Sequence, residues 1–371
     1  MSLSLRKTTE WMSFALCNHK QVGAFFEPLI QSYLPGWTVN GFRAQIKDIG
    51  RESGSVVSLT LRPDQSWQGF QAGQYINLTV EINGAKLTRC FSISSSPETY
   101  RMTGTVRLTI REQDQGVVTP WLATGLKKGG YVSLSAACGE FVVQRNGVPK
   151  VFIAAGVGIT PILSMLSDLV DQGESKPVKL LYYGSDHLFR SELSALESAK
   201  SNFSFDFLNT RESGYFDRET VQRLLEQYAP EQFEKPDYYI CGPGEMITSV
   251  EQILKDSGVS PERIHFEFFG VPRALDVQVS ESGQASRAVA FSQTQAEVSV
   301  EPGDRRTLLE IAEGAGLNPV HGCRAGVCHQ CSCRKLGGRV QNILTGQVSD
   351  GGAELVQLCI SQPVDDVELA L

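Results

Sequence analysis

Five of the nine cysteines of the chain lie within its last 49 residues. Three of them are spaced as Cys323-x4-Cys328-x2-Cys331, and Cys359 follows after 27 further residues. This is the ligand spacing of a plant-type 2Fe-2S cluster, in which four thiolates hold the two irons. The segment between the first three cysteines is rich in Gly and Ala, which allow a tight loop to wrap an inorganic core. The spacing therefore predicts an iron–sulfur domain at this end of the chain.

Two other metal centres compete with this interpretation. A structural zinc site could use the same thiols, and Cys333 adds a fifth, but zinc ligands usually come as two close cysteine pairs. A Rieske centre needs two histidine ligands, and although His329 follows Cys328, the chain has no second pair of that kind. Cys333 falls outside the four-ligand pattern, and we assign it no role in the cluster. The expected metal ligands are Cys323, Cys328, Cys331 and Cys359.

Length and charge exclude several classes of protein. A chain of 371 residues is longer than one hydrophobic core usually organises, so two to three domains are expected. The net charge of −7 gives no basic footprint for nucleic acid. No window approaches the roughly 18 to 20 apolar residues of a membrane span, and the first 20 residues show no clear signal-peptide cleavage site. Clustered cysteines without a secretory signal indicate a cytoplasmic protein.

The hydrophobic pattern changes along the chain. Helix-like apolar spacing gives way to short alternating runs separated by Gly, Asn and Asp, which predict an antiparallel barrel. Apolar strands alternating with helical stretches follow, and they predict a parallel α/β sheet. A polar stretch without periodicity then indicates a linker. The expected parts are a helical extension (1–36), a β-barrel domain (37–147), an α/β domain (148–272), a linker (273–286) and a cysteine-rich domain (287–371).

A glycine-rich turn follows the first strand of the expected α/β domain. Residues 151–155 (VFIAA) run into GVGITP (156–161), where helical spacing begins. Two glycines let a diphosphate approach the backbone, and the amides of a helix start favour an anion. This turn alone is weak support, but CGPG (241–244) ends a later strand. The candidate nucleotide-binding residues are Gly156, Gly158, Thr160, Pro161, Ser185, Arg190, Cys241, Gly242 and Pro243.

The end of the second strand bears on the choice between NADH and NADPH. A 2′-phosphate requires positive charge there, and the sequence places Ser185 and Asp186 at this point, with Arg190 slightly later. Asp186 would repel a phosphate, whereas Ser185 and Arg190 could bind one. The sequence favours NADH and leaves NADPH open.

These motifs resemble those of known families. HGCRAGVCHQCSC, preceded by TLLEIAEGAGLNPV and followed by LCISQPV, resembles the ferredoxin domain at the C-terminus of many flavin reductases, which has a β-grasp fold. GxGxTP together with CGP resembles the pyridine-nucleotide domain of the ferredoxin-NADP reductase superfamily. The resemblance implies that the barrel binds a flavin, FAD rather than FMN, and that the α/β domain binds NAD(P)H. It also implies that the Cys241 thiol lies beside the nicotinamide, although a buried cysteine is by itself an ordinary core residue.

The resemblance extends to the barrel. Arg89-Cys90-Phe91-Ser92 resembles the RxYS flavin motif, which implies that Arg89 pairs with a flavin phosphate and that Ser92 hydrogen-bonds near flavin N5. Phe91 replaces the usual Tyr and lacks its hydroxyl. GQY (73–75) and GVVT (116–119) resemble two further flavin-binding segments, although each alone is typical of an ordinary turn. The candidate flavin-binding residues are Tyr75, Arg89, Cys90, Phe91, Ser92, Gly116, Val118, Thr119 and Phe269.

The stretch RIHFEFFG (263–270) closes the α/β domain. Family members carry there an acid near the flavin and an aromatic ring that stacks on it, which implies these roles for Glu267 and Phe269. Ordinary strand packing is the alternative. The catalytic residues implied by the resemblance are Ser92, Cys241 and Glu267.

The order of domains implies an electron path. NAD(P)H gives two electrons as hydride, a 2Fe-2S cluster takes one, and a flavin converts between them. The whole chain resembles the reductase partners of membrane fatty acyl-CoA desaturases, and similar architectures serve ring-hydroxylating and demethylating oxygenases or the hybrid cluster protein. We therefore expect a reductase that passes electrons to an acceptor protein, with a desaturase as first choice.

The charge of the C-terminal residues bears on the kind of acceptor. Residues 287–371 carry ten acidic against seven basic side chains, so the acceptor is expected to present a basic patch.

A different class of function is a cluster-based redox sensor, but such a sensor would not need the nucleotide-binding and flavin-binding motifs that hydride transfer requires. A third is an enzyme that reduces a small molecule such as a quinone.

Overall fold

The structure is a computed structural model, and it describes residues 22–39, 41–113, 116–186, 188–209, 218–219, 235–269, 286–317, 319–322, 324, 326 and 330–371. The predictions for residues 1–21, for the linker at 273–285, and for Cys323, Cys328 and His329 fall outside these ranges. The chain forms two compact units, Met1–Val143 with Leu163–Glu174 and Gln144–Ile162 with Ser175–Leu371. Helix α2 (Val22–Tyr33) is the described part of the helical extension. No helix within the described ranges is long and apolar enough to cross a membrane.

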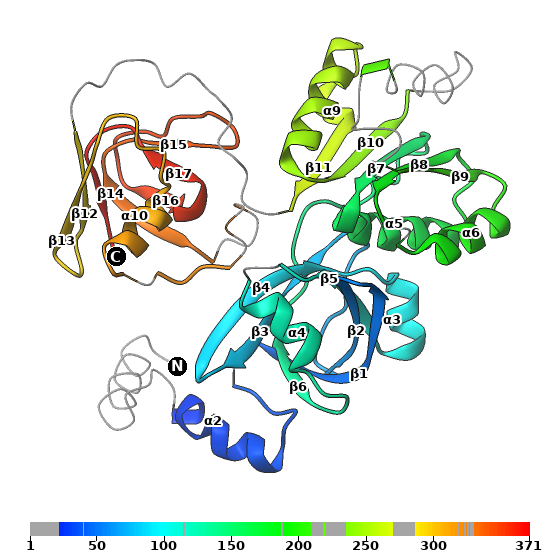
Figure 1. Cartoon of the computed structure of the whole chain (residues 1–371), viewed down its shortest axis with the longest axis horizontal. Coiled ribbons are helices and arrows are strands. Elements are labelled where there is room, and N and C mark those ends of the chain that lie inside the picture. The colour runs from blue at the N-terminus through cyan, green and yellow to red at the C-terminus, as the bar shows by residue number, and fades with distance from the viewer. Residues whose placement is uncertain are drawn as a thin grey trace, which may run out of the picture. The chain divides into compact units, whose positions relative to one another are not determined.

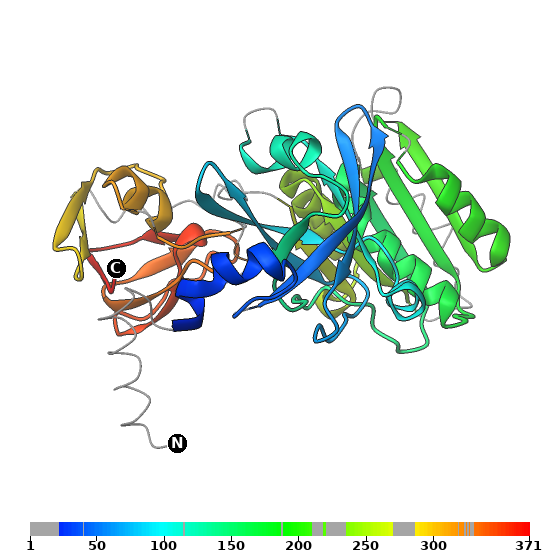
Figure 2. The same cartoon turned by 90° about the horizontal axis from the view of Figure 1, so that it is seen from below.

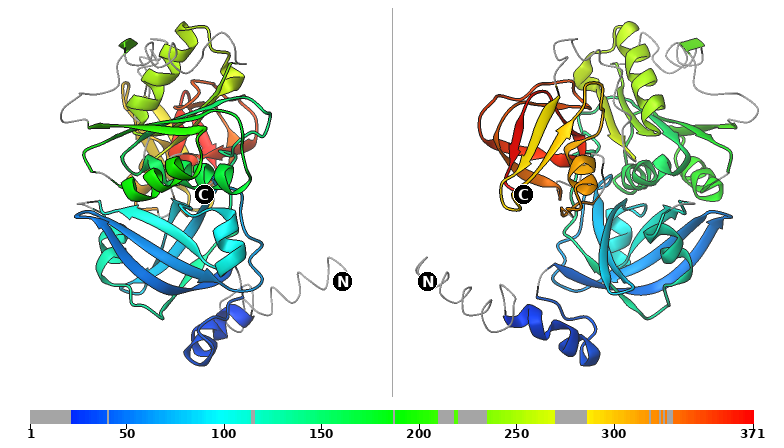
Figure 3. Two further views of the ribbon diagram at one scale, coloured as in Figure 1. Left: turned by 90° about the vertical axis from the view of Figure 1, so that its right-hand side faces the viewer. Right: turned by 60° about the vertical axis from the view of Figure 1, so that its left-hand side comes forward.

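The first unit contains a six-stranded antiparallel sheet. Its strands are β1 (Phe42–Ser53), β2 (Val56–Pro63), β3 (Tyr75–Ile82), β4 (Ala85–Ser92), β5 (Val106–Arg111) and β6 (Tyr131–Leu134), with helices α3 (Pro97–Thr103) and α4 (Val118–Thr124) between them. The strand order is β4-β3-β6-β1-β2-β5, and a bridge between Ile93 and Leu108 joins the residue after β4 to β5. The sheet closes on itself (Figure 3), which confirms the predicted antiparallel barrel.

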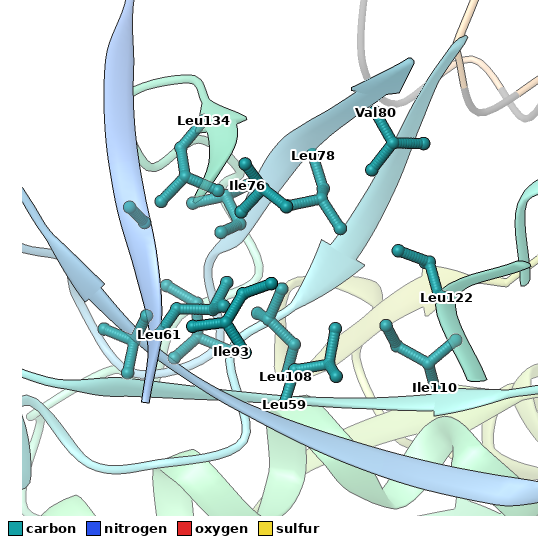
Figure 4. Packing of buried hydrophobic residues seen from close by; sticks show 14 of the residues in the cluster. Leu59, Leu61, Ile76, Leu78, Val80, Ile93, Leu108, Ile110, Leu122 and Leu134 are labelled. Carbon is teal, nitrogen blue, oxygen red and sulfur yellow. The ribbon is translucent and has the colours of Figure 1, made fainter. Parts of the chain in front are cut away.

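Alternation of apolar residues builds the barrel core. Leu59 and Leu61 of β2, Ile76 and Leu78 of β3, and Leu108 of β5 are buried and point into one cluster (Figure 4). Side chains two residues apart lie on the same face of a strand, so each strand presents one apolar face to the interior. Burial of each of these side chains is worth about 1.5–3 kcal/mol. The other face of each strand is left for polar residues.

A tight hairpin joins β3 and β4. Ile82 pairs with Ala85, so that only Asn83 and Gly84 make the turn, and both have positive φ (52° and 79°). Two central residues in this conformation match the twist of the flanking strands. The turn thereby sets which residues of β3 and β4 face each other, as far as the Tyr75–Ser92 pair at the other end of the ladder.

A five-stranded parallel sheet follows in the second unit. It consists of β7 (Lys150–Ala155), β8 (Val178–Gly184), β9 (Phe203–Asn209), β10 (Asp237–Gly242) and β11 (Ile264–Phe268), with helices η1 (Gly156–Gly158), α5 (Ile159–Asp171), α6 (Arg190–Ala199), α9 (Gly244–Asp256) and η2 (Pro261–Arg263). Figures 1 and 2 show α9 on one face of the sheet and α6 on the other. The predicted parallel α/β fold is confirmed.

The order of these strands locates a binding edge. The chain runs from β7 outward to β8 and β9 and then crosses to β10 and β11, which gives the order β11-β10-β7-β8-β9. The direction of winding therefore reverses between β7 and β10. Open parallel sheets bind ligands at such a switch point, beyond the carboxyl ends of the strands.

The C-terminal residues form a separate mixed sheet with one helix. Its elements are β12 (Arg287–Phe291), β13 (Ala296–Val300), α10 (Leu308–Gly314), β14 (Ser332–Gly337), β15 (Val340–Asn342), β16 (Glu354–Gln357), η3 (Leu358–Ile360), β17 (Ser361–Pro363) and β18 (Val367–Leu369). The main sheet has the order β13-β12-β18-β14-β16, with β12 and β18 parallel. Thr307 and Glu310 form a capping box that starts α10.

Candidate functional site

The predicted flavin motif forms the last part of β4. Residues 89–92 pair with residues 75–78 of β3 in an antiparallel ladder. Phe91 is opposite Ile76 and packs against the barrel core. Because neighbouring side chains alternate, Ser92 points to the other face, together with its partner Tyr75. The motif therefore presents Arg89 and Phe91 on one face, and Cys90 and Ser92 on the other.

A run of buried serines begins in this motif. Ser92, Ser94, Ser95 and Ser96 are all buried. Three of their hydroxyls have protein partners, namely Thr109 Oγ1 for Ser94 (3.0 Å), the Arg107 amide for Ser95 (3.0 Å) and Asp171 Oδ2 for Ser96 (2.7 Å). Ser92 Oγ has no hydrogen-bond partner among the described residues, although Ser92 is only 5% exposed. A buried polar group without a partner costs about 1–3 kcal/mol. Ser92 therefore fits the predicted contact with a flavin.

Arg89, the predicted phosphate ligand, is half-buried and lies two residues before Phe91. Its Nη1 donates to the Thr88 carbonyl at 2.7 Å. This contact holds the guanidinium close to its own strand. The pairing with a flavin phosphate remains a prediction.

The second predicted flavin segment is a turn that leads into α4. The Thr119 hydroxyl accepts a hydrogen bond from the Gln113 amide at 3.0 Å, and the Gly116 amide donates to the Gln113 carbonyl at 2.8 Å. Val118 is buried in the barrel core. Since these groups serve the turn and the core, any contact of Val118 with a diphosphate must come from its backbone.

The glycine-rich turn of the α/β domain lies at the carboxyl end of β7. Gly156 has φ +55° and accepts a hydrogen bond at its carbonyl from the Tyr182 hydroxyl (3.0 Å). A Cβ on Gly158 would be 2.2 Å from the Cys241 carbonyl oxygen, so only glycine lets the turn pass this close to β10. The Thr160 hydroxyl donates to the Val157 carbonyl at 2.9 Å. This geometry brings the two predicted nucleotide motifs together at the switch point.

Cys241 is the second-last residue of β10 and lies beside Glu267 of β11, its direct neighbour across the parallel strands. The thiol is 0% exposed, and burial raises its pKa well above the ordinary value, with a further rise from the Glu267 carboxylate. Cys241 is therefore a neutral thiol rather than a thiolate nucleophile. Glu267 is also buried, and Phe269 directly follows β11. The structure thus groups Cys241 with Glu267, while the contact of either residue with a cofactor stays a prediction.

The remaining nucleotide candidates lie at the same edge of the sheet. Gly242 is the last residue of β10 and Pro243 is the N-cap of α9, while Pro161 belongs to the first turn of α5. Ser185 follows the end of β8, and Arg190 is the exposed first residue of α6. All of these candidate residues lie at the carboxyl ends of parallel strands or at the starts of the helices that follow them. Open parallel sheets bind ligands at this edge.

Two of the four predicted cluster ligands are described, and both are buried. Cys331 precedes β14, and Cys359 follows β16, its antiparallel partner. The Leu358 amide donates to the Cys331 carbonyl at 3.1 Å, so the ladder extends to the cysteines themselves. The Gly326 amide donates to Cys359 Sγ at 3.3 Å. Backbone donors of this kind commonly surround cluster sulfurs, so the described residues fit a 2Fe-2S cluster. Cys333 lies within β14 and packs in the domain core.

A charged network supports the cysteine loop, and the sequence analysis missed it. Arg324 has φ +56°, and its guanidinium binds the Glu313 carboxylate of α10 with both terminal nitrogens, one at 3.0 Å. Its Nη2 also donates to His321 Nε2 at 3.0 Å, while His321 Nδ1 faces the Pro319 carbonyl at 3.0 Å. Protein groups thus engage both ring nitrogens of His321. An arginine inside the ligand loop was the available signal, but its acidic partner is not adjacent in the sequence.

Three family models match successive parts of the chain. They are an oxidoreductase FAD-binding domain at residues 43–143, an oxidoreductase NAD-binding domain at 152–252 and a 2Fe-2S iron–sulfur cluster binding domain at 291–364. Each match falls on the sheet described above for that part of the chain. The cofactors predicted from the sequence, FAD, NAD(P)H and a 2Fe-2S cluster, are confirmed at this level.

Known proteins are similar to this chain over most of its length. The NADPH oxidoreductase of Mycobacterium tuberculosis is 28% identical over 340 residues, which is 90% of this chain and 86% of that protein. The glycine betaine monooxygenase reductase subunit of Pseudomonas aeruginosa is 28% identical over 322 residues, or 80% of this chain and 86% of that subunit. The solved structure of phthalate dioxygenase reductase shares the fold, with a TM-score of 0.61 at 20% identity over 89% of this chain and 98% of that chain. The chain is thus an oxidoreductase of the ferredoxin reductase type, with an FAD-binding domain, an NAD-binding domain and a C-terminal 2Fe-2S domain.

Proposed function

We propose that the chain takes hydride from NAD(P)H at the switch point between β7 and β10 and passes electrons singly to an acceptor protein. FAD supplies the conversion from a two-electron donor to the one-electron cluster when it is bound. In this proposal Ser92 contacts the flavin near N5, Arg89 binds its phosphate, and Cys241 lies beside the nicotinamide. The observation that carries the proposal is the combination of FAD, NAD and 2Fe-2S domains in one chain.

The remaining candidate residues have supporting roles in this proposal. Glu267 and Phe269 line the flavin from β11, and Gly156, Gly158 and Thr160 hold the nucleotide diphosphate against the start of α5. Cys323, Cys328, Cys331 and Cys359 hold the cluster, and the hydrogen bond from the Gly326 amide to Cys359 Sγ supports this assignment. The domain boundaries at 36, 147, 272 and 286 are part of the proposal, and limited proteolysis with mass spectrometry tests them.

The acceptor we propose is an oxygen-activating iron enzyme. The similarity to a glycine betaine monooxygenase reductase subunit supports an oxygenase. The resemblance of the whole sequence to desaturase reductases supports a membrane fatty acyl-CoA desaturase. Both enzymes need electrons delivered one at a time, so the same reductase chemistry serves either. The cytoplasmic location expected from the cysteines is part of this proposal.

The test is reconstitution with NADH, a purified oxygenase in one arm and desaturase-containing membranes in the other. We expect turnover in one arm with the wild-type chain. The control variant is Cys359→Ser, which should keep NADH-dependent reduction of ferricyanide and lose electron delivery to the acceptor. Equal activity of the variant would contradict the path through the cluster. A visible spectrum that does not bleach on addition of NADH would favour the redox-sensor hypothesis, and turnover of a quinone without a protein partner would favour a small-molecule reductase.

The preference for NADH is a separate proposal. Asp186 directly follows Ser185 at the carboxyl end of β8, where a carboxylate disfavours a 2′-phosphate. We expect a higher kcat/KM with NADH than with NADPH, and a shift towards NADPH in Asp186→Ser. Arg190→Ala should lower kcat/KM for NADPH more than for NADH. An unchanged ratio in both variants would contradict this role for the β8 end.

A further inference from the structure

We propose that Asn77 is an additional residue of the flavin site and that its side-chain carbonyl accepts a hydrogen bond from the N3–H of the flavin ring. Asn77 is 8% exposed, and its Oδ1 has no hydrogen-bond partner among the described residues. A buried amide oxygen without a donor costs about as much as a lost hydrogen bond. Asparagine is also depleted in strands, so its place in the middle of β3 calls for a partner.

Register and alternation place Asn77 beside the flavin motif. Asn77 pairs with Cys90, and the adjacent pair on the same face is Tyr75 with Ser92. The face is opposite to the one on which Ile76 packs in the barrel core. Asn77 and Ser92 are thus diagonal neighbours on adjacent strands, within reach of one ligand. Both carry a buried polar atom that lacks a partner in the described part of the chain.

The next pair along the same face behaves differently. Thr79 and Thr88 lie opposite each other, and their hydroxyls hydrogen-bond at 2.7 Å. Polar side chains on this face therefore satisfy one another where no ligand is expected. Among the residues described on this face of β3 and β4, buried side-chain atoms without partners occur only at Ser92, within the motif, and at its diagonal neighbour Asn77. This confinement indicates a ligand rather than a general defect in packing.

The backbone of Asn77 is fixed by two hydrogen bonds. Its amide donates to Ser135 Oγ at 2.9 Å, and its carbonyl accepts from the Ser135 amide at 3.0 Å. These bonds hold the Cα–Cβ bond of Asn77 towards the face that it shares with Ser92. The flavin ring offers a single N–H donor in its oxidised form, N3–H, on the same ring edge as N5. A side chain next to Ser92 that only accepts at Oδ1 matches that donor.

The inference rests on the proposed flavin contact of Ser92, and the test separates the two. The variant Asn77→Leu keeps the number and branching of the side-chain heavy atoms and removes the polar amide. We expect its apoprotein to be as stable as wild type or more stable, since a buried unsatisfied group is gone. We also expect about 3- to 10-fold weaker FAD binding, measured by quenching of flavin fluorescence on titration of the apoprotein. A purely structural Asn77 would give the opposite result, with a less stable apoprotein and unchanged affinity.

The matched control is Thr79→Val, which breaks the satisfied Thr79–Thr88 pair on the same face. It should lower the unfolding midpoint of the apoprotein and leave the affinity for FAD unchanged. A second probe is a flavin methylated at N3, which cannot donate from that atom. Wild type should bind it more weakly than the parent flavin, whereas Asn77→Leu should bind both equally.

The results distinguish the role of Asn77 from the flavin site of Ser92 and from the proposed function. Equal discrimination against the methylated flavin by wild type and Asn77→Leu would overturn the role of Asn77. It would leave the flavin site of Ser92 intact if Ser92→Ala still weakens FAD binding. Failure of wild type to bind any FAD would instead overturn the proposed function.

Discussion

The surroundings of the Cys241 thiol determine its reactivity. It sits at a predicted catalytic position, yet burial and the neighbouring Glu267 carboxylate raise its pKa. Reactivity of a cysteine follows the exposed thiolate. We expect iodoacetamide at pH 8 to label half-exposed Cys138 at least about tenfold faster than Cys241 in the native holoprotein. Peptide mass spectrometry after timed quenching measures both rates, and comparable labelling would contradict the buried neutral thiol.

The close packing of Gly158 against β10 leads to a prediction about NADH binding. A Cβ there would meet the Cys241 carbonyl at 2.2 Å, whereas a Cβ on nearby Gly244 would lie 3.6 Å from Phe268, an ordinary contact. Gly158→Ala should therefore displace the turn and weaken NADH binding by about tenfold or more, a loss of about 1.4 kcal/mol. Gly244→Ala should bind NADH as wild type does. Isothermal titration of both variants measures the difference, and equal affinities would rule out the close approach as the reason for glycine.

Sequence and structure contributed different residues to the site. Ser92 and Cys241 could be predicted because each belongs to a short motif of adjacent residues. Asn77 and Glu313 could not, since their roles depend on a strand register and on a helix end that lie outside any motif. Val118 was predicted with its neighbours, but its side chain belongs to the barrel core. A motif identifies a segment, whereas the fold decides which side chains of the segment are available.

Strands β14 and β16 carry a buried lysine that holds their register. Lys335 is 0% exposed and pairs across the ladder with Glu354, its Nζ lying 2.8 Å from the carboxylate. The same ammonium donates to the Gly338 carbonyl (2.6 Å) and Ser349 Oγ (2.9 Å). The other end of this ladder leads to Cys331 and Cys359. Removal of the lysine therefore leaves several acceptors without a donor at the end of the ladder away from these cysteines.

We expect Lys335→Met to lower the stability of the C-terminal domain by about 1–3 kcal/mol, because the acceptors of the buried ammonium lose their donor, whereas Glu354 is exposed to solvent. The control is Arg339→Ala, which breaks a half-exposed pair with Asp365 and should cost at most about 1 kcal/mol. Denaturant titration followed by the visible absorbance of the cluster compares them. Equal losses in the two variants would show that Lys335 does not hold the ladder.

A row of stacked aromatic rings crosses three strands of the parallel sheet, and one of the rings makes the free energy of unfolding depend on pH. Phe152 of β7 stacks on Tyr239 of β10 with their ring centroids 5.1 Å apart. Tyr239 stacks on His265 of β11 with a centroid distance of 4.8 Å. Burial lowers the pKa of His265 below its ordinary value, although Asp237 acts in the opposite direction. As the pH falls below about 7, the unfolded chain takes up this proton before the folded chain does. The free energy of unfolding should therefore fall with decreasing pH in this range.

The variant His265→Phe keeps the stack and removes the titrating group. We expect a smaller loss in melting temperature between pH 7.5 and 5.5 than in wild type. Differential scanning calorimetry at both pH values measures the two losses. Identical losses would mean that His265 titrates alike in the folded and unfolded chains.

The elements themselves were largely predictable, because strand periodicity and turn residues are local properties. The alternation in β2 and β3 and the apolar runs of β7 and β8 lead directly to an antiparallel and a parallel sheet. Strand order is not local, and the switch point between β7 and β10 became clear only when the order was known. The Arg324–Glu313 pair likewise joins a loop to a helix that the sequence separates.

The net negative charge of the C-terminal residues predicts an effect of salt on electron transfer to the proposed acceptor. The C-terminal residues 287–371 have three more acidic than basic side chains, so docking to an acceptor with a basic patch should be favoured at low salt. We expect the rate of acceptor reduction to fall about tenfold between low and about 0.5 M ionic strength. Reduction of a neutral quinone by the same protein should change far less. Stopped-flow measurement of both reactions checks this, and parallel salt dependence would argue against electrostatic docking.

The two-residue turn at Asn83 and Gly84 has a consequence for how this protein can vary. Substitutions in β3 and β4 change one side chain at a time, but one residue inserted into either strand between this turn and the flavin motif would shift the pairing of every position beyond it. Asn77 and Ser92 would then no longer be diagonal neighbours, although neither residue had changed. Related sequences that keep this flavin face should therefore tolerate many replacements in the hairpin while preserving its length.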